Sequence, residues 1–187
     1  TLKRRNLMKN FNIAVIEGDG IGPEIVREAI KVIEKAIAKY DTVITWTPVL
    51  AWGCAIDATG TPLPQETVDI CLKSDSVFLG AIGGPKWDTL PGNMRPEKAL
   101  LGIRKAMDVY ANLRPAKVFK ELRNASPIKD EIIGEGFDIM MVRELCGGIY
   151  FGERGRKDID GVEHAYDIGQ YSREEVKRVA IVAFDLA

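Results

Sequence analysis

Residues 16–25 read IEGDGIGPEI, which places Gly18, Gly20 and Gly22 between an apolar run and a helix-like segment. A dinucleotide-binding fingerprint has the spacing G-x-G-x-x-G after a strand. Here the spacing is G-x-G-x-G with Pro23 next, which misses the fingerprint by one residue. The pattern favours a tight strand-to-helix turn, in which Gly22 lies near the N-cap and Pro23 begins the helix. The N-terminus of such a helix can still face an anion or a cofactor.

Strand-like and helix-like segments alternate on both sides of this turn. Strand-like runs occupy residues 11–16, 42–49, 76–82, 116–119, 137–145 and 148–153. Helical periodicity occupies residues 23–39, 64–73, 97–107 and 172–187. The alternation predicts an α/β fold with a largely parallel sheet. Residues 83–96, GGPKWDTLPGNMRP, are predicted to form a long loop, and long loops in compact domains often carry function.

The composition is typical of a globular protein and gives no sign of a nucleic-acid or membrane partner. Of 187 residues, 46% are hydrophobic and 28% charged, and the net charge is −1. A nucleic-acid-binding domain usually carries a strongly basic surface. No apolar run approaches the length of a membrane-spanning helix. The length allows one domain, or one domain and part of another.

The two ends of the chain give different indications. Residues 1–7, TLKRRNL, precede Met8, which we interpret as the natural start, with residues 1–7 as an upstream or disordered segment. They are too short for a signal peptide. Near the other end, Ser172 and Glu175 form a capping box before an apolar run that continues to Ala187. We expect an N-terminal fragment that stops within a helix, the alternative being a natural C-terminal helix docked on the domain.

Cysteine and histidine offer little chemistry. Cys54, Cys71 and Cys146 are odd in number and form no C-x-x-C pair, which supports neither a zinc site nor a disulfide framework. A reducing, cytoplasmic location is the simplest interpretation. His164 is the only histidine and lies in GVEHAYD, a polar loop or an edge strand, where a catalytic role is disfavoured.

The segment 97–107 places chemically useful side chains on one helix face. Glu97 is followed at helical spacing by Leu100 or Leu101 and then by Arg104. This spacing aligns a carboxylate, an apolar group and a guanidinium along one face. Taken alone, each arginine is more commonly a solvated surface charge.

Two further arginines and a tyrosine follow. Arg114 lies in NLRP, and Arg143 ends the apolar run DIMMV. Guanidinium groups bind carboxylates in a planar, two-pronged way, so converging arginines would suit a dicarboxylate. Tyr150 follows Gly147 and Gly148 and can serve as a proton donor next to cations. Spacing alone leaves open whether these groups converge, and a half-buried strand tyrosine is the alternative for Tyr150.

Four stretches together resemble a known family. IEGDGIGPEI, GAIGGPKWD, RPEKALLGIRKAMDVYANLRPAKVF and VRELCGGIYFGE occur in this order, as in the β-decarboxylating dehydrogenases. The combination is most similar to the 3-isopropylmalate dehydrogenase branch and covers nearly all of residues 8–187. The isocitrate branch usually has a serine-bearing segment in place of PEKALLGIRK. One departure is Cys146, where the family usually has Thr.

The resemblance implies a fold, although not the doubly wound dinucleotide-binding one. It implies an isopropylmalate/isocitrate dehydrogenase-like α/β fold with a mixed sheet flanked by helices, incomplete at the C-terminus. Residues 8–110 would be the first α/β domain, and residues 111–187 would begin a second, dimerisation and arm domain. The glycine turn would border the cofactor cleft, with Ile21 as a contact. The arm of a homodimer would lie near residues 150–170.

The resemblance also implies roles for individual residues. The three arginines Arg104, Arg114 and Arg143 would bind the carboxylates of a 2-hydroxy dicarboxylate. Glu97, Leu100 and Leu101 would contact the isopropyl group and the nicotinamide end of the cofactor. Tyr150 would be the general acid that protonates the enol after carbon dioxide leaves.

The implied activity is the oxidative decarboxylation of 3-isopropylmalate to 4-methyl-2-oxopentanoate in leucine biosynthesis, with NAD and Mg²⁺ or Mn²⁺. The metal ligands, the catalytic lysine and the residues that choose NAD over NADP would lie beyond Ala187, so we expect the 187-residue chain alone to be inactive. A tartrate- or malate-type decarboxylating dehydrogenase and a non-catalytic homologous subunit are the alternatives.

Overall fold

The computed structural model describes residues 9–187, so the expected start at Met8 and the segment 1–7 lie outside the described residues. The chain forms two compact units that divide between Met107 and Asp108. We describe each unit by itself. None of the described helices is both long enough and apolar enough to cross a membrane.

The first unit is built on a parallel sheet of three strands in the order β2-β1-β3. The strands are β1 (Lys9–Gly18), β2 (Thr42–Pro48) and β3 (Ser76–Ala81), and Ile13 of β1 lies opposite both Trp46 and Ser76. The inner strand β1 carries a continuous apolar run because both of its faces are covered. Its residues Ala14, Val15 and Ile16 are buried. The predicted parallel α/β arrangement is confirmed.

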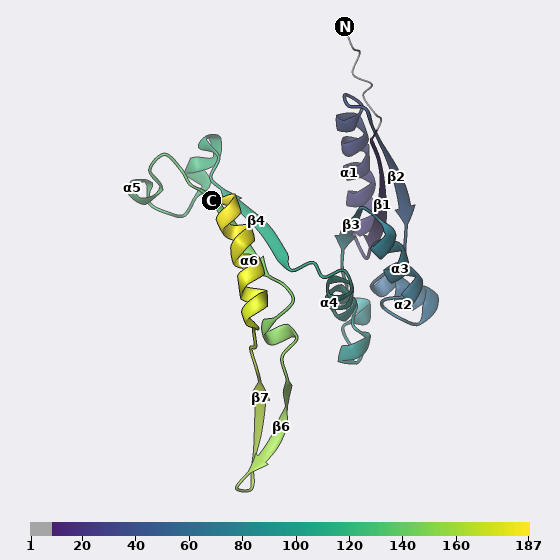
Figure 1. The fold of residues 1–187 in the computed structure, drawn as a ribbon, viewed down its shortest axis with the longest axis vertical. Helices are drawn as coiled ribbons and strands as arrows, with labels where there is room; N and C mark the ends of the chain where they lie inside the picture. Colours follow the sequence, from purple (N-terminus) through teal and green to yellow (C-terminus); the bar gives the residue numbers. More distant parts are fainter. Residues whose placement is uncertain (1–8) are drawn as a thin grey trace. The chain divides into compact units, whose positions relative to one another are not determined.

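Four helices accompany this sheet: α1 (Gly22–Ile37), α2 (Gly53–Thr59), α3 (Gln65–Lys73) and α4 (Pro96–Ala106). Helix α1 packs against β1 and β3 through an apolar stripe that includes the buried Val26 (Figure 1). The core between α3, α4 and the sheet contains the buried side chains Trp52, Cys71 and Ile103. Three of the predicted helices are therefore found here, and α2 was not predicted.

The glycines of the opening stretch allow a close approach of backbones. Gly18 has φ +81°, and a Cβ on it would clash with the carbonyl oxygen of Ala81 in β3. A Cβ on Gly22 would clash with the carbonyl oxygen of Glu17. The N-cap of α1 is Ile21, one residue before the expected position. The glycines thus serve the packing of the end of β1 against β3 and α1, as the strand-to-helix interpretation predicted.

The second unit contains two antiparallel pairs and a long helix. Strand β4 (Ala111–Lys117) pairs with β5 (Asp138–Glu144), and β6 (Arg154–Ile159) pairs with β7 (Val162–Asp167). Helix α6 (Arg173–Leu186) packs against β5, and α5 (Asp130–Ile133) is a single turn. The predicted capping box is present at the start of α6: Glu175 N donates to Ser172 Oγ at 3.2 Å, and Ser172 N donates to Glu175 Oε2 at 2.7 Å.

Two strand predictions need correction. Residues 148–153 are not a strand: Gly148–Tyr150 form the 3-10 helix η4, because Gly148 has φ +77° and its N–H donates to Gln170 O at 2.8 Å. The strand predicted at 116–119 begins earlier, at Ala111, and ends at Lys117. The predicted loop 83–96 contains two short 3-10 helices, Pro85–Trp87 and Gly92–Met94.

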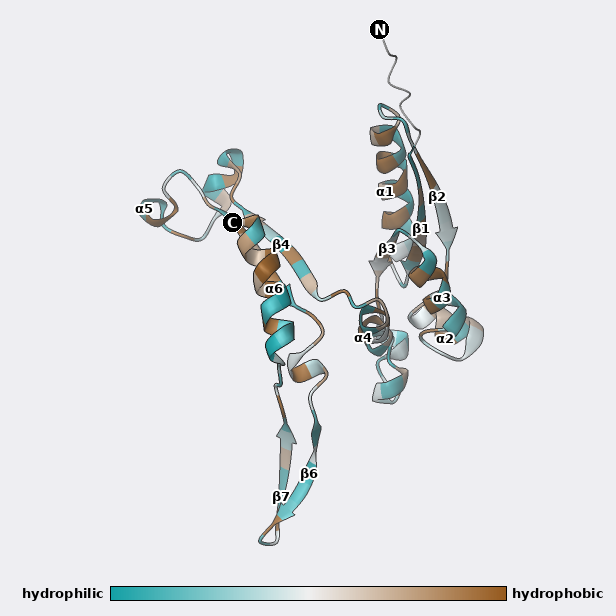
Figure 2. Ribbon diagram, viewed as in Figure 1, coloured by the Kyte–Doolittle hydropathy of each residue, from teal (hydrophilic) through white to brown (hydrophobic). Residues whose placement is uncertain are grey.

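The second unit has little buried apolar core of its own. Ile133 is the one buried apolar side chain among residues 108–187. Met141 of β5 is 56% exposed, and Phe184 of α6 is 83% exposed. Figure 2 shows further apolar residues on the C-terminal half of α6, whereas the β6–β7 hairpin is mostly polar. Exposed apolar surface of this kind commonly marks an interaction site.

Candidate active site

A buried carboxylate organises the loops at one end of the parallel sheet. Asp19, in the turn after β1, is 2% exposed. Its Oδ2 accepts hydrogen bonds from Gly53 N at 2.9 Å and Gly83 N at 2.8 Å, and its Oδ1 accepts one from Cys54 N at 2.7 Å. Asp19 thus joins the first turn to the start of α2 and to the loop after β3. We did not single out this residue from the sequence, although an acid between two glycines after an apolar strand was a usable signal.

We expect Asp19→Asn to lower the free energy of unfolding by about 2 kcal/mol, because the amide would turn an N–H group toward backbone donors. The measurement is urea denaturation of the full-length protein. Asp69→Asn is the matched control, since Asp69 is exposed and its one recorded partner is the Gln65 amide. Equal unfolding midpoints for Asp19→Asn and wild type would refute the prediction.

Ile21 and Glu97 both lie at this end of the sheet, beside the loops that Asp19 joins. Ile21 is 60% exposed and follows Asp19 by two residues. The Glu97 carboxylate covers the loop after β3, because a Cβ on Gly83 would lie 2.7 Å from Glu97 Oε1. Gly83 is also bonded to Asp19. In open α/β sheets, ligands bind beyond the carboxyl ends of the strands, which is where these residues gather.

The two leucines predicted to contact a ligand lie on different sides of helix α4. Leu100 packs against the core cluster of the first unit. Leu101 and Arg104 lie four and seven positions after Glu97, so they follow its side chain along one helix face. Leu101 and Arg104 are both half-buried. Leu101 is therefore the better placed of the two leucines to meet a ligand.

The β4–β5 register places the other two predicted arginines on one face. Arg143 lies directly opposite Asn112, and Arg114 follows Asn112 by two residues, so both arginine side chains leave the same face. Arg114 Nε donates to Asn112 Oδ1 at 3.2 Å. Two exposed guanidinium groups therefore lie on one face of a two-stranded ladder, and guanidinium groups can bind carboxylates in a two-pronged way.

Tyr150 lies beside Arg143. The guanidinium carbon of Arg143 is 5.6 Å from the centre of the Tyr150 ring, within the range of a cation–π contact. Both residues line a cleft of about 400 Å³ within the second unit. The remaining lining residues are Glu144, Gly147, Ile149, Tyr171, Val176 and Val179. The structure therefore brings Arg143 and Tyr150 together.

A second cleft, of about 420 Å³, lies within the first unit. Its lining is mostly apolar, with the carboxylates Glu17 and Glu66, and includes no Lys or Arg. Carboxylates and phosphates need cationic partners, so this cleft does not suit the substrate class that the arginines indicate.

The thiols and the acidic residues of the described chain add no further site. Burial raises the pKa of Cys54, Cys71 and Cys146, so these thiols stay protonated at neutral pH. Within residues 9–187, no three His, Cys, Asp or Glu side chains gather closely enough to hold a metal ion. The sole histidine, His164, lies in β7 opposite Lys157.

Comparison with known proteins assigns the chain to one family. Residues 12–187 match the family model described as isocitrate/isopropylmalate dehydrogenase. The chain belongs to the isocitrate/isopropylmalate dehydrogenase family. The resemblance inferred from the four sequence stretches is confirmed.

The most informative relatives within this family are two clostridial enzymes and two solved structures. The chain is 62% identical over 180 residues to the 3-isopropylmalate dehydrogenase of Clostridium acetobutylicum, covering 96% of this chain and 50% of that protein. The 3-isopropylmalate dehydrogenase of Clostridium pasteurianum is 60% identical, again over 96% of this chain and 50% of that protein.

Isocitrate dehydrogenase from Methylococcus capsulatus superposes with a TM-score of 0.74 at 30% identity, over 95% of this chain and 47% of that one. A β-decarboxylating dehydrogenase from Thermococcus kodakarensis superposes with a TM-score of 0.64 at 28% identity, over 94% of this chain and 45% of that one. The chain spans about half the length of the curated relatives it matches. The solved structures therefore show the fold of this part of the family.

Proposed function

We propose that the full-length protein carrying this chain is an NAD-dependent 3-isopropylmalate dehydrogenase. It would convert 3-isopropylmalate to 4-methyl-2-oxopentanoate and carbon dioxide, in the cytoplasm, as a step of leucine biosynthesis. The observation that carries the proposal is the group formed by Arg143, Arg114 and Tyr150: two guanidinium groups on one strand face, one of them against the ring of a proton donor. The names of the clostridial relatives support this substrate.

Each of these side chains has a task that the chemistry requires. Arg114 and Arg143 bind the substrate carboxylates and orient the bond between C3 and the β-carboxylate. After C2 is oxidised, that bond breaks, carbon dioxide leaves, and the bonding pair passes into an enolate. The phenol of Tyr150 then donates its proton to C3, which gives the methylene group of the product.

The residues at the end of the parallel sheet suit the nicotinamide part of NAD⁺, which accepts the hydride from C2 when bound. The nicotinamide ring has apolar faces and a positive charge. Ile21 offers an exposed apolar side chain, and the Glu97 carboxylate offers the opposite charge. The α1 N-terminus, which follows Ile21, presents backbone N–H groups to anionic parts of the cofactor. These features support the binding of a nicotinamide cofactor at this place.

A divalent cation, Mg²⁺ or Mn²⁺, belongs to the proposal, but residues 9–187 contain no cluster of ligands that fits it. No step is therefore assigned through a metal bound by this chain. The base that takes the C2 hydroxyl proton is likewise not assigned among the described residues.

We also propose a homodimer. A two-stranded hairpin is marginally stable by itself, and the β6–β7 hairpin has no buried residue along its length. The apolar side chains exposed on β5 and α6 need cover as well. A second copy of the chain would stabilise the hairpin and cover the apolar side chains of β5 and α6. Sedimentation of the full-length protein tests this, and a monomer at micromolar concentration would contradict it.

The test of the proposed activity is NAD⁺ reduction by the full-length protein with four substrates: 3-isopropylmalate, isocitrate, tartrate and malate. We expect 3-isopropylmalate to give the highest kcat/KM. Preference for tartrate or malate would indicate the alternative decarboxylating dehydrogenase. No turnover of any of the four would indicate a non-catalytic homologue.

Leu101→Ser should weaken selection for the isopropyl group, because an apolar side chain in contact with the substrate contributes about 1–3 kcal/mol to discrimination. We expect kcat/KM for 3-isopropylmalate to fall about tenfold relative to malate. Leu100→Ser is the matched control: Leu100 packs against the core, so this change should lower thermal stability more than it changes the substrate ratio. Equal substrate ratios for Leu101→Ser and wild type would contradict the assignment.

A further inference from the structure

The carboxylate of Glu144 holds the turn that leads to Tyr150. Glu144 is the last residue of β5, and its side chain is 9% exposed. Cys146 N donates to both of its oxygens at 2.9 Å, and Gly147 N donates to Oε2 at 2.7 Å. The 3-10 helix that ends at Tyr150 begins one residue later, at Gly148. The carboxylate therefore fixes the direction in which the chain leaves β5.

Arg178 of α6 holds this carboxylate from the other side. Its guanidinium lies 3.7 Å from Glu144 Oε1 and 2.9 Å from Asp108 Oδ1. The same group stacks over the Tyr110 ring at 4.5 Å from the ring centre. Strand β5, helix α6 and the start of the second unit are thereby joined through one buried carboxylate and one guanidinium.

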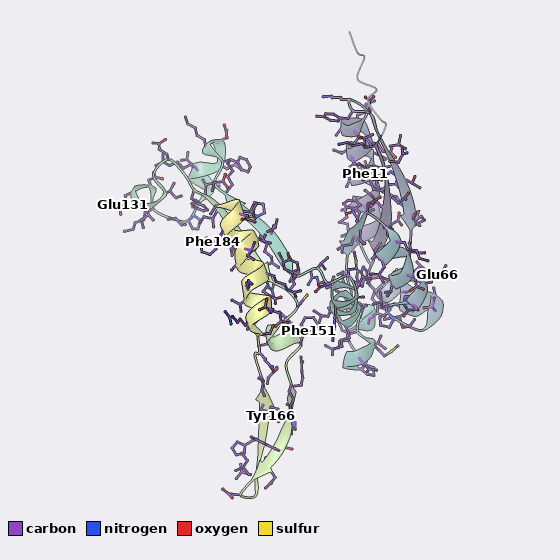
Figure 3. The ribbon with its side chains drawn as sticks, in the orientation of Figure 1. Phe11, Glu66, Glu131, Phe151, Tyr166 and Phe184 are labelled. Carbon is purple, nitrogen blue, oxygen red and sulfur yellow. The ribbon has the colours of Figure 1, made fainter. Side chains whose placement is uncertain are left out.

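The far side of the turn is equally confined. A Cβ on Gly147 would lie 2.9 Å from the Tyr171 ring, and a Cβ on Gly148 would clash with the Tyr171 hydroxyl. Phe151 follows Tyr150 and lies near Ser172 at the start of α6 (Figure 3). The turn is therefore held between Glu144 and Tyr171, and Tyr150 follows it within three residues.

We propose that Glu144 is a positioning residue for Tyr150 and that Arg178 keeps its carboxylate in place. The inference rests on the proposed role of Tyr150 as proton donor. An ionised carboxylate is required, because it offers acceptors to both backbone N–H groups. A glutamine would turn its NH₂ group toward one of these donors and release part of the turn. Glu144 lines the same cleft as Tyr150, but its oxygens are taken up by Cys146 N, Gly147 N and Arg178, so it acts through the placement of the phenol.

The experiment is a double-mutant cycle in the full-length protein with Glu144→Gln and Tyr150→Phe, assayed with 3-isopropylmalate and NAD⁺. We expect Glu144→Gln to lower kcat about tenfold, with KM within about twofold of wild type, because misplacing a reacting group by a fraction of an ångström has effects of this size. In the Tyr150→Phe background, Glu144→Gln should cost no further activity, since the phenol it positions is absent. Backbone amide exchange at Cys146 and Gly147 should be faster in Glu144→Gln.

The matched control is Glu131→Gln on α5, a Glu that is labelled in Figure 3 and whose exposed carboxylate faces Lys129 at 3.8 Å. This change should leave kcat and KM at wild-type values. If Glu144→Gln does not fold, Arg178→Lys decides instead, because Lys keeps the charge but cannot contact Asp108 and Glu144 together.

Three results would overturn the inference: unchanged kcat in the decisive variant, an equal loss in both backgrounds, or a loss confined to KM. An inactive wild-type protein would overturn the proposed function itself, and this inference with it. The two failures are distinguishable because the first occurs with an active wild type.

Discussion

Tyr150→Phe is expected to lower kcat for 3-isopropylmalate by about 10²- to 10⁴-fold in the full-length protein, the range for loss of a positioned general acid. The phenyl ring keeps the contact with Arg143, which lies 5.6 Å from the ring centre, so KM should change little. The change removes the phenolic proton and leaves the rest of the cleft in place. The loss therefore falls on the step that protonates C3.

A defect in the protonation step can be recognised from the time course of NADH formation. Hydride transfer precedes protonation, so stopped-flow mixing of Tyr150→Phe with saturating substrate should show a rapid burst of NADH followed by slow turnover. Tyr171→Phe is the matched control, because Tyr171 lines the same cleft and is assigned no proton transfer. A burst-free Tyr150→Phe with normal kcat, or an equal loss in Tyr171→Phe, would contradict the assignment.

The regular elements follow from local signals. The capping box of Ser172 and Glu175 and the apolar stripe of α1 need no tertiary information, and both were found where the sequence predicted them. The parallel sheet was predictable from the alternation of strand-like and helix-like segments along the chain.

The missed elements depend on contacts between distant residues. Helix α2 has only seven residues, and the backbone N–H groups of Gly53 and Cys54 at its start are satisfied by Asp19, far away in the sequence. Residues 148–153 carry β-forming side chains, but Gly148 and its bond to Gln170 turn the chain into a 3-10 helix. Tertiary contacts overrode local propensity in both places.

The hairpin is a different case, because a local signal was present. Asp160 and Gly161 both have positive φ, and a D-G pair between two strands favours a tight hairpin turn. The flanking strands, RGRKDI and VEHAYD, are mostly charged or polar and lack the apolar alternation of a strand with a buried face. Their composition suits a hairpin with both faces exposed.

The candidate site was predictable as residue types and not as an arrangement. The order of motifs pointed to Arg114, Arg143 and Tyr150, but sequence spacing cannot show which strand faces they leave. The register that sets Arg143 opposite Asn112 supplies this for the second unit. Asp19 and Glu144 were missed because each acts by accepting backbone N–H groups, and only Asp19, an acid between two glycines after an apolar strand, left a usable signal in the sequence.

Arg143→Gln is expected to raise KM for 3-isopropylmalate about 100-fold or more, because removing one partner of a charge-assisted contact costs about 2–5 kcal/mol and leaves a carboxylate unpaired. KM for NAD⁺ should stay near the wild-type value, since Arg143 lies in the second unit with Arg114 and Tyr150. The KM of Arg143→Lys for 3-isopropylmalate should lie between those of wild type and Arg143→Gln, because Lys keeps the charge and loses the two-pronged geometry.

Lys117→Gln provides the control for loss of a positive charge from the same ladder. Lys117 lies on β4 opposite Asp138 and, three residues from Arg114, leaves the other face of the ladder. Its ion pair is exposed, so its loss should change stability by less than about 1 kcal/mol and leave KM unchanged. If Arg143→Gln and Lys117→Gln raised KM equally, the effect would be one of net charge. A rise confined to Arg143→Gln would show that one face of the β4–β5 ladder binds the substrate carboxylate.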